Sequence, residues 1–299
     1  MKKVLVIGSS NTDMIIQTET IPLPGQTLLG GEFMTFGGGK GANQAIAAQR
    51  AGGNVQFVVS VGDDDLGKAA MASFSKEGIK TDYAQVLEGT PSGVALIFVD
   101  SKGENSIAVA PGSNDKLEPE YLENNKDAFA DASHLLIQLE TPMKTVEKAV
   151  AMAKNSGIPA IINPAPAAEL SDTVLDGLFC ITPNETETEV LTGVKVDDIE
   201  SASKAAEVLR SKGVQNVIIT LGSNGALLCN ADGVHHQPAP KVTAVDTTAA
   251  GDTFNGILTT VLAEGKSLPE SMELAVKGAS LSVQIAGASS SIPQRAQFD

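Results

Sequence analysis

The sequence predicts an α/β protein built on a mostly parallel sheet. Short apolar runs alternate along most of the 299 residues with segments that have helical periodicity. Glycine is frequent, tryptophan is absent and aromatic residues make up only 4% of the chain, a composition typical of strands covered by tightly packed helices. Alternating strands and helices form βαβ units, so we expect the sheet to be mainly parallel.

Each predicted element follows from its local pattern. The buried strands are apolar runs that end in Gly, Ser, Asn, Glu or Pro, and they lie at residues 3–10, 55–62, 134–140, 159–166, 177–183 and 216–222. The helices have apolar residues at helical spacing, and several end in glycine; they lie at 40–53, 65–78, 143–157, 184–193 and 201–213, with two more between 251 and about 286.

Two stretches interrupt this alternation. Residues 14–36 contain strand-like residues with Pro and Gly but no helical pattern, and residues 92–110 form two alternating runs around "DSKGEN". The second stretch predicts a β-hairpin. We expect both stretches to pair into a small sheet that covers the core.

Composition and charge exclude several classes of protein. The net charge of −15 disfavours nucleic-acid binding. No apolar run approaches the roughly 18–20 residues of a membrane span, and the apolar run at the N-terminus is too short for a signal peptide. Cys180 and Cys229 lie in apolar runs and predict buried thiols, and we expect His235 and His236 at the surface. These features predict a reduced, cytoplasmic protein that binds no membrane.

The stretch "VDTTAAGDTFNG", residues 245–256, places small residues at a helix entrance. Small residues let a ligand approach the backbone closely, and the N–H groups at a helix start bind anions. Asp252 in the first turn is either a helix cap or a general base beside the anion site.

The stretch "FGGGKGANQA", residues 36–45, is a second glycine-rich helix entrance. It is no Walker motif, because Lys40 is followed by Gly41 rather than Ser or Thr. It matches a loose dinucleotide pattern, but no buried strand precedes it, and a tight loop is the simplest alternative. Asn43 offers both a donor and an acceptor and lies near Lys40, which favours recognition of sugar hydroxyls.

These two stretches, extended as "GGGKGANQAIAAQRAGGNVQFVVSVGDD" and "DTTAAGDTFNG", resemble the two signatures of the PfkB-type carbohydrate kinases. The resemblance covers the whole chain, since "GSSNTDMI", "QLET", "NPAPA", "PNETE" and "TLGSNGA" also match, in order, the members that phosphorylate ribose. It implies one kinase domain, residues 1–299, with a three-layer αβα core and a small β-sheet lid inserted at 14–36 and 92–110.

The resemblance also implies the reaction and its residues. Phosphoryl transfer from ATP to O5 of D-ribose would give D-ribose 5-phosphate, with Asp252 as general base and the backbone of Ala249, Ala250 and Gly251 as anion hole. The sugar-binding residues implied are Asn11, Thr12, Asp13, Gly39, Lys40, Gly41, Ala42, Asn43, Glu140 and Asp252. A carboxylate can accept from two neighbouring hydroxyls, so Asp13 suits a ribose diol.

On the nucleotide side, Asn184 and Glu187 match an element that organises Mg²⁺ and phosphate through water. Their spacing fits a helix capping box equally well, and both interpretations can hold together. The other implied ATP contacts are Thr220, Leu221, Gly222, Ser223, Asn224, Gly225, Gly251 and Val276. A β-turn is the alternative for the 220–225 segment, and Val276 replaces the Asn that many relatives have near the adenine.

The resemblance further implies activation by a monovalent cation, K⁺, and a homodimer joined through the lids. The implied cation ligands, several through backbone carbonyls only, are Asp246, Thr248, Ser282, Ile285, Gly287 and Ser291. Ile285 stands where related kinases often have Arg.

Two alternatives remain from the sequence. A kinase for 2-deoxyribose or another furanose would use the same motifs. A sugar- or nucleotide-binding regulator without turnover is the alternative from another class, and the intact Asp252 and its small-residue run argue against it.

Overall fold

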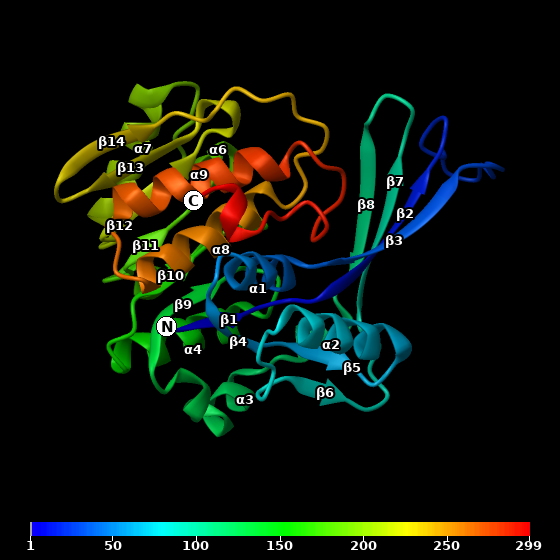
Figure 1. Ribbon diagram of the computed structural model, residues 1–299, viewed down its shortest axis with the longest axis horizontal. Helices are drawn as coiled ribbons and strands as arrows, with labels where there is room; N and C mark the ends of the chain where they lie inside the picture. Colours follow the sequence, from blue (N-terminus) through cyan, green and yellow to red (C-terminus); the bar gives the residue numbers. More distant parts are fainter. Residues whose placement is uncertain (1) are drawn as a thin grey trace.

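An eight-stranded sheet forms the centre of the protein, in the order β14-β13-β12-β11-β10-β9-β1-β4 (Figure 1). The computed structural model describes residues 2–299. The strands from β12 to β4 in this order are parallel, and β13 runs antiparallel to both of its neighbours, β12 and β14. The strands are β1 (Lys3–Ile7), β4 (Asn54–Val58), β9 (Ala132–Ile137), β10 (Ala160–Ile162), β11 (Cys180–Ile181), β12 (Asn216–Thr220), β13 (Ala226–Asn230) and β14 (Gly233–Gln237). The predicted α/β class with a mostly parallel sheet is confirmed.

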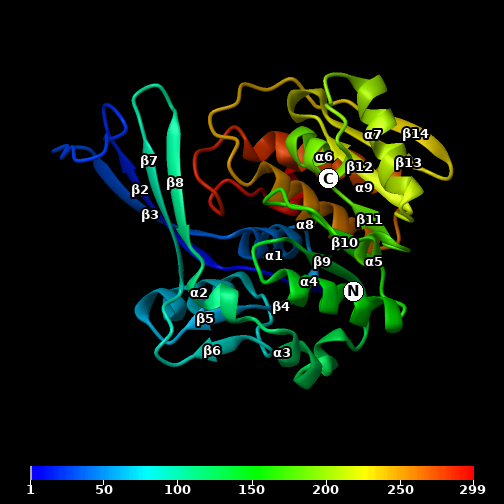
Figure 2. The same cartoon turned by 180° about the vertical axis from the view of Figure 1, so that it is seen from behind.

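Helices cover both faces of this sheet and bury two separate apolar clusters (Figures 1 and 2). One face carries α1 (Lys40–Arg50), α2 (Asp65–Glu77), α8 (Ala250–Ala263) and α9 (Leu268–Ser282). The other face carries α3 (Pro119–Asn124), α4 (Met143–Asn155), α5 (Asp172–Leu175), α6 (Glu185–Thr192) and α7 (Ile199–Ser211). The three-layer architecture follows, and Cys180 and Cys229 are buried in it as free thiols.

A second sheet of four strands, ordered β3-β2-β7-β8, stands beside the layered core and extends away from it (Figure 1). Its strands are β2 (Asn11–Gln17), β3 (Glu32–Gly38), β7 (Gly93–Val99) and β8 (Asn105–Ala110). The two predicted stretches therefore do pair with each other, and the 92–110 hairpin is confirmed. The first two strands extend beyond the predicted 14–36, which brings Asn11 and Asp13 into the base of this sheet.

Two features of the strands differ from the sequence-based expectation. The single strand expected over 55–62 is wrong: it divides at Val59, whose carbonyl accepts from the backbone N–H of Gln85. The second half becomes β5 (Ser60–Gly62), which pairs with β6 (Gln85–Leu87) in a separate two-stranded sheet. The β13–β14 hairpin was not expected; His235 and His236 lie on its exposed second strand.

The start of α1 packs directly on the end of β1. A Cβ at Gly41 would overlap the backbone of Gly8 and Ser9, and a Cβ at Gly8 would come within 2.8 Å of the Gly41 Cα. Glycine at both positions therefore lets two backbones touch, which presses the first turn of α1 against the carboxyl end of the sheet.

Helices α1 and α8 are in equally close contact. A Cβ at Gly256 would lie 2.7 Å from the backbone nitrogen of Ala48 and from the carbonyl oxygen of Gln44, and the hydroxyl of Thr260 donates to the Ala48 carbonyl at 3.1 Å. This packing fixes the first turn of α8 beside the first turn of α1. Within residues 2–299, no helix combines the length and the apolar character that crossing a lipid bilayer requires.

Candidate active site

Polar side chains from distant parts of the sequence meet at the carboxyl edge of the parallel strands. This edge is where ligands bind in open α/β sheets. It contains the residues that follow β1, β9, β10, β11 and β12, and the N-termini of α1 and α8 face it. The predicted sugar and phosphate residues therefore come together in one region.

The two glycine-rich helix entrances differ in their free hydrogen-bonding groups. At α1, Glu140 Oε2 accepts from the Lys40 N–H at 2.9 Å, while the hydroxyl and carbonyl of Ser9 accept from Gly41 at 3.3 Å and Ala42 at 2.8 Å. These three N–H groups are consumed inside the protein, so the α1 entrance offers a ligand its side chains rather than its backbone donors.

At α8 the backbone donors remain open. Ala249 has a left-handed conformation with φ 59°, unusual for a residue other than glycine, and the Ala250 N–H donates to Thr247 at 3.2 Å. In the described chain the N–H groups of Gly251 and Asp252 donate to no protein acceptor, and a Cβ on Gly251 would meet nothing within 4 Å. The open donors in the described chain thus belong to Ala249, Gly251 and Asp252, while the Ala250 N–H is engaged by the Thr247 carbonyl.

The carboxylate of Asp252 belongs to the same first turn of α8 and is 7% exposed. Its Oδ2 accepts from Asn43 Nδ2 at 3.0 Å, and its Oδ1 accepts from Gln44 Nε2 at 2.9 Å. Burial raises the pKa of Asp252, while the positive charge of Lys40 and the two amide donors oppose that rise. Asp252 is therefore not the N-cap, which is Ala249; it is a fixed carboxylate in the first turn.

Negative charge is concentrated around Lys40. Burial alone would lower the pKa of the Lys40 ammonium, but Asp252, Glu140, Glu187 and Asp13 together hold it above its usual range. The four carboxylates come from β2, the loop after β9, α6 and α8, and only the fold brings them around one cation.

Asp13 has a raised pKa in this cluster of carboxylates. Burial raises the pKa of Asp13 to about 6, and the negative charges of Glu140 and Asp252 add to the effect. Gly38, on the paired strand, lies directly against the carboxylate, where a Cβ would overlap it. Burial and the neighbouring carboxylates therefore make the ionised form of Asp13 unfavourable in the folded protein.

Two amides at the sugar side have free polar atoms. Asn11 Oδ1 accepts from Asn114 Nδ2 at 2.8 Å, which leaves the Asn11 amide N–H groups to donate elsewhere. Asn43 Oδ1 is buried and has no hydrogen-bond partner among the described residues. Buried polar atoms are normally paired, so this acceptor fits a ligand hydroxyl.

Thr12 and Gly39, two further predicted sugar-binding residues, lie beside Asn11 and Asp13 in the structure. Thr12 lies on β2 between Asn11 and Asp13, and because side chains alternate along a strand, it faces the opposite side of the sheet. Gly39 has φ 87° and a Cβ there would lie 2.7 Å from the Asn11 nitrogen, so its role in the structure is a close turn.

Asn184 and Glu187 form the capping box at the start of α6. The Glu187 N–H donates to Asn184 Oδ1 at 2.8 Å, and Glu187 Oε2 accepts from the Asn184 N–H at 2.9 Å. Burial raises the pKa of Glu187, the Asn184 hydrogen bond and Lys40 oppose the rise, and Asp252 adds to it. The capping interpretation is confirmed. The influence of Lys40 and Asp252 on its pKa indicates that this carboxylate lies in the same charged region as they do.

The 220–225 segment forms a tight turn after β12. The Thr220 N–H donates to Pro183 at 2.9 Å, which links the turn to the start of α6, and the Leu221 N–H donates to Gly225 at 2.8 Å. Gly222, Ser223 and Asn224 at its tip are exposed. Val276 on α9 is only 4% exposed, so a nucleotide can reach little of this side chain.

Asp246 connects two loops beside the start of α8. Its two oxygens accept from the N–H groups of Thr248 and Gly287, each at 2.9 Å. Burial opposes ionisation of Asp246, but these hydrogen bonds outweigh it and hold its pKa below the usual value. The hydroxyls of Ser282 and Ser291 donate to Ala279 and Ala288.

The predicted cation ligands therefore offer the Asp246 carboxylate, backbone carbonyls and hydroxyl oxygens whose hydrogens are already donated. These hard oxygen donors suit K⁺. Ile285 is 50% exposed and can contribute only its carbonyl. The described residues contain no group of three or more His, Cys, Asp or Glu side chains arranged to hold a metal ion.

Sequence reasoning missed a buried polar network beneath Asp252. Its members are Gln44, Gln138, Asn163, Thr182 and Asn255. Three of them, Gln138, Asn163 and Thr182, directly follow β9, β10 and β11, and the available signal was a polar residue near the end of each predicted strand.

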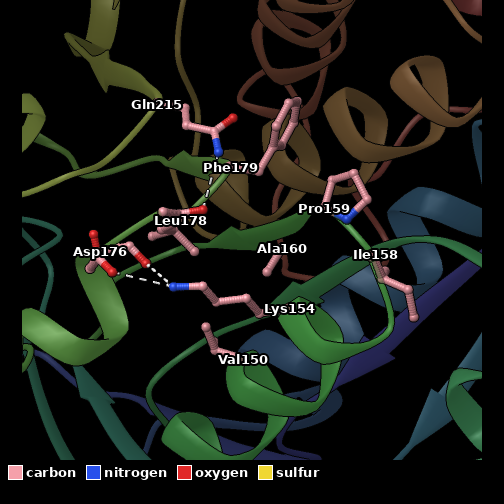
Figure 3. Close-up of a pocket in the computed structure, with 11 residues that line it drawn as sticks. Val150, Lys154, Ile158, Pro159, Ala160, Asp176, Leu178, Phe179 and Gln215 are labelled. Atoms are coloured by element: carbon pink, nitrogen blue, oxygen red, sulfur yellow. Dashed lines mark hydrogen bonds and ion pairs between the residues drawn. The ribbon is translucent and has the colours of Figure 1, made fainter.

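A hollow of about 240 Å³ lies at the opposite edge of the sheet, between α4 and the entry to β11 (Figure 3). Its polar groups are already paired: Lys154 Nζ donates to the Asp176 carbonyl at 3.0 Å, and Gln215 Nε2 donates to the Gly177 carbonyl at 3.2 Å. It contains none of the predicted site residues, and we place the site at the carboxyl edge.

Comparison with known proteins identifies the family of the chain. The family described as pfkB family carbohydrate kinase matches residues 1–295. The chain belongs to this family of carbohydrate kinases.

Several relatives and solved structures match nearly the whole chain. The ribokinase of Haemophilus influenzae is 44% identical over 296 residues, covering 99% of this chain and 97% of its own. A deoxyribokinase of Salmonella typhi is 38% identical over 297 residues, with 99% and 97% covered. The structure of Arabidopsis thaliana ribokinase complexed with ribose and ATP superposes with a TM-score of 0.94 at 32% identity, covering 99% and 97%.

The raised pKa of Asp13 predicts a pH-dependent stability. Because folded Asp13 binds its proton more tightly than the unfolded chain does, its contribution to the free energy of unfolding falls as the pH rises from 3.8 to about 6. We expect Asp13→Asn to stabilise the protein by about 1–3 kcal/mol at pH 8, with the gain shrinking toward pH 5. Denaturant unfolding at pH 8 and pH 5 measures the change in the free energy of unfolding, and Asp232→Asn, at an exposed position, is the control. An equal effect of Asp13→Asn at both pH values would contradict the assignment.

Proposed function

We propose that the protein is an ATP-dependent ribokinase that transfers a phosphoryl group to O5 of D-ribose and forms D-ribose 5-phosphate. The observation that carries this proposal is the first turn of α8, where the buried Asp252 carboxylate lies next to the open N–H groups of Gly251 and Asp252 itself. A base and an anion site on the same helical turn suit an alcohol acceptor and a migrating phosphoryl group.

In this mechanism Asp252 accepts the proton of the 5-hydroxyl as the phosphoryl group arrives. The raised pKa of Asp252 makes its carboxylate a stronger base. Lys40 and the two amide donors favour the ionised form, which is the form that accepts a proton. The open N–H groups at the positive end of α8 stabilise charge on the transferring phosphoryl oxygens.

Asp13 and Asn43 would fix the sugar. The Asp13 carboxylate can accept from two adjacent hydroxyls, and the unpaired Asn43 Oδ1 can accept from a third. The sheet formed by β2, β3, β7 and β8 carries Asp13 and would act as a lid that excludes water, so that ATP is not hydrolysed.

The nucleotide would bind on the other side of α8, near the exposed tip at Gly222–Asn224. Glu187 and Asn184 would hold a Mg²⁺ ion through water, and this ion would neutralise charge on the ATP phosphates. We also infer that residues 1–299 work as a single kinase domain, and that the protein is cytoplasmic, because its two cysteines are buried free thiols.

A panel of acceptors with the purified protein tests the proposed function. We expect ATP-dependent phosphorylation of D-ribose, and a kcat/KM for 2-deoxyribose at least about tenfold lower, because the site would leave a buried polar group unpaired without the 2-hydroxyl. Equal or better use of deoxyribose would identify a deoxyribokinase. Ribose binding without product would indicate a regulator.

In the same assay, Asp252→Asn is expected to lower kcat by about 10²–10⁴-fold while ribose still binds, because the amide cannot accept the proton at neutral pH. Calorimetric titration with ribose separates binding from turnover. Activity of Asp252→Asn close to that of the wild type would exclude Asp252 as the base.

A monovalent cation beside Asp246 would support the anion site by ordering the loop before α8. We therefore expect kcat to be severalfold higher in KCl than in NaCl at equal ionic strength. Asp246→Ala is expected to abolish this difference, since the loop loses both the carboxylate and its bonds to Thr248 and Gly287. Equal rates of the wild type in both salts would count against the site.

The four-stranded sheet would join two subunits. Exposed apolar side chains lie on both faces of this sheet: Phe33 and Leu96 on one face, and Ile107 and Val109 on the other, each at least half exposed. Sedimentation is expected to report a dimer for the wild type, and Ile107→Lys is expected to weaken it. A wild-type monomer at micromolar concentration would contradict the dimer.

A further inference from the structure

A chain of buried side-chain amides lies directly beneath the Asp252 carboxylate. Gln44 on α1 is fully buried, and its Nε2 donates to Asp252 Oδ1 at 2.9 Å and to Asn163 Oδ1 at 3.0 Å. Its Oε1 accepts from Gln138 Nε2 at 2.6 Å. Both ends of the Gln44 amide are therefore engaged.

These contacts leave the Gln44 amide one orientation. An ionised carboxylate only accepts, so Asp252 requires the nitrogen of Gln44 on its side, and the Gln44 oxygen then faces Gln138 and accepts from its Nε2. Gln138 is itself fully buried and lies against Gly8, where a Cβ would overlap its Oε1. The close packing of Gly8 thus holds the amide that orients Gln44.

The same network reaches the backbone of the anion site. Asn163 Nδ2 donates to the Thr182 carbonyl at 3.2 Å, and the Thr182 hydroxyl donates to Asn255 Oδ1 at 2.7 Å. Asn255 Nδ2 then donates to the Gly251 carbonyl at 2.8 Å. One continuous set of hydrogen bonds connects the carboxylate of Asp252 with the peptide that precedes it.

We propose that Gln44 is a positioning residue for the Asp252 base, fixing the direction of its carboxylate and favouring its ionised form; this rests on the kinase function proposed above. Asn43 binds the other carboxylate oxygen at the sugar side, whereas Gln44 approaches from the core and is covered by protein. A donor from the covered side holds the carboxylate without occupying the space of the substrate.

The charged groups around Asp252 explain why such a donor matters. Lys40 from α1 favours the ionised carboxylate, while Asp13 from β2, Glu140 after β9 and Glu187 from α6 are three negative charges in the same region. A donor to the ionised form lowers the pKa of a buried carboxyl and opposes the effects of burial and of these neighbours.

The experiment compares Gln44→Met, which removes the donor, with Gln44→Glu, which replaces it by a second carboxyl. The matched control is Gln56→Met, since Gln56 is also buried but lies on β4 and donates to the Lys80 carbonyl. Steady-state rates with ribose between pH 5 and 9 give kcat, KM and the acid limb of kcat/KM.

For Gln44→Met we expect kcat to fall by about 10- to 100-fold, the ribose KM to change by less than about twofold, and the acid limb to move up by about one pH unit. Gln44→Glu is expected to move the acid limb further, because two carboxyls then compete for one proton. Gln56→Met is expected to leave all three quantities unchanged.

A Gln44→Met protein with wild-type kcat and acid limb would overturn the proposal, and so would a loss of kcat without any movement of the acid limb. If Gln44→Met does not fold, Gln138→Met removes the partner that orients Gln44 and is expected to give a smaller change in the same direction. No change in that folded variant would likewise overturn the proposal.

Carbon-13 NMR titration of the Asp252 carboxyl, assigned with Asp252→Asn, separates this inference from the proposed function. An upward shift of the Asp252 pKa in Gln44→Met supports the positioning role even if ribose is not the substrate. An unchanged pKa rejects it even if ribose is phosphorylated.

Discussion

The contact between α1 and α8 is the constraint on which the site depends. Gly256 lets α8 lie against the backbone of α1, and this places Asp252 within hydrogen-bonding distance of Asn43 and Gln44. A larger residue at Gly256 would separate the helices and leave a buried carboxylate without donors, which is strongly unfavourable. The close packing of α1 against α8 therefore also stabilises the buried Asp252 carboxylate.

The two glycine-rich helix entrances show how similar sequences acquire different uses. The N-terminal N–H groups of α1 donate to Glu140 and Ser9, so that entrance is closed and presents Lys40 and Asn43 instead. The entrance of α8 keeps the N–H groups of Gly251 and Asp252 open. A helix terminus binds an anion only where its N–H donors are unpaired. The residues that pack against the terminus determine whether those donors are paired.

Several site residues have both a structural and a functional basis. Asn184 and Glu187 cap α6, Asp246 connects two loops, and Gly38 makes room for Asp13. Asp13 and Asp252, by contrast, are held against their electrostatic preference, since burial raises the pKa of each. Such unfavourable carboxylates are typical of functional sites, where the stability of the fold tolerates strain that the chemistry uses.

The sequence by itself determined the α/β class, the two helix entrances, the family resemblance and Asp252 as the central carboxylate, because periodicity, glycine placement and local motifs are properties of neighbouring residues. It did not determine the break at Val59, the β13–β14 hairpin, the closed donors of α1, or the network through Gln44, Gln138 and Asn163. Those features depend on which distant strands and helices come into contact. The partner of a buried amide or an open N–H is a property of tertiary packing, and only the folded chain decides it.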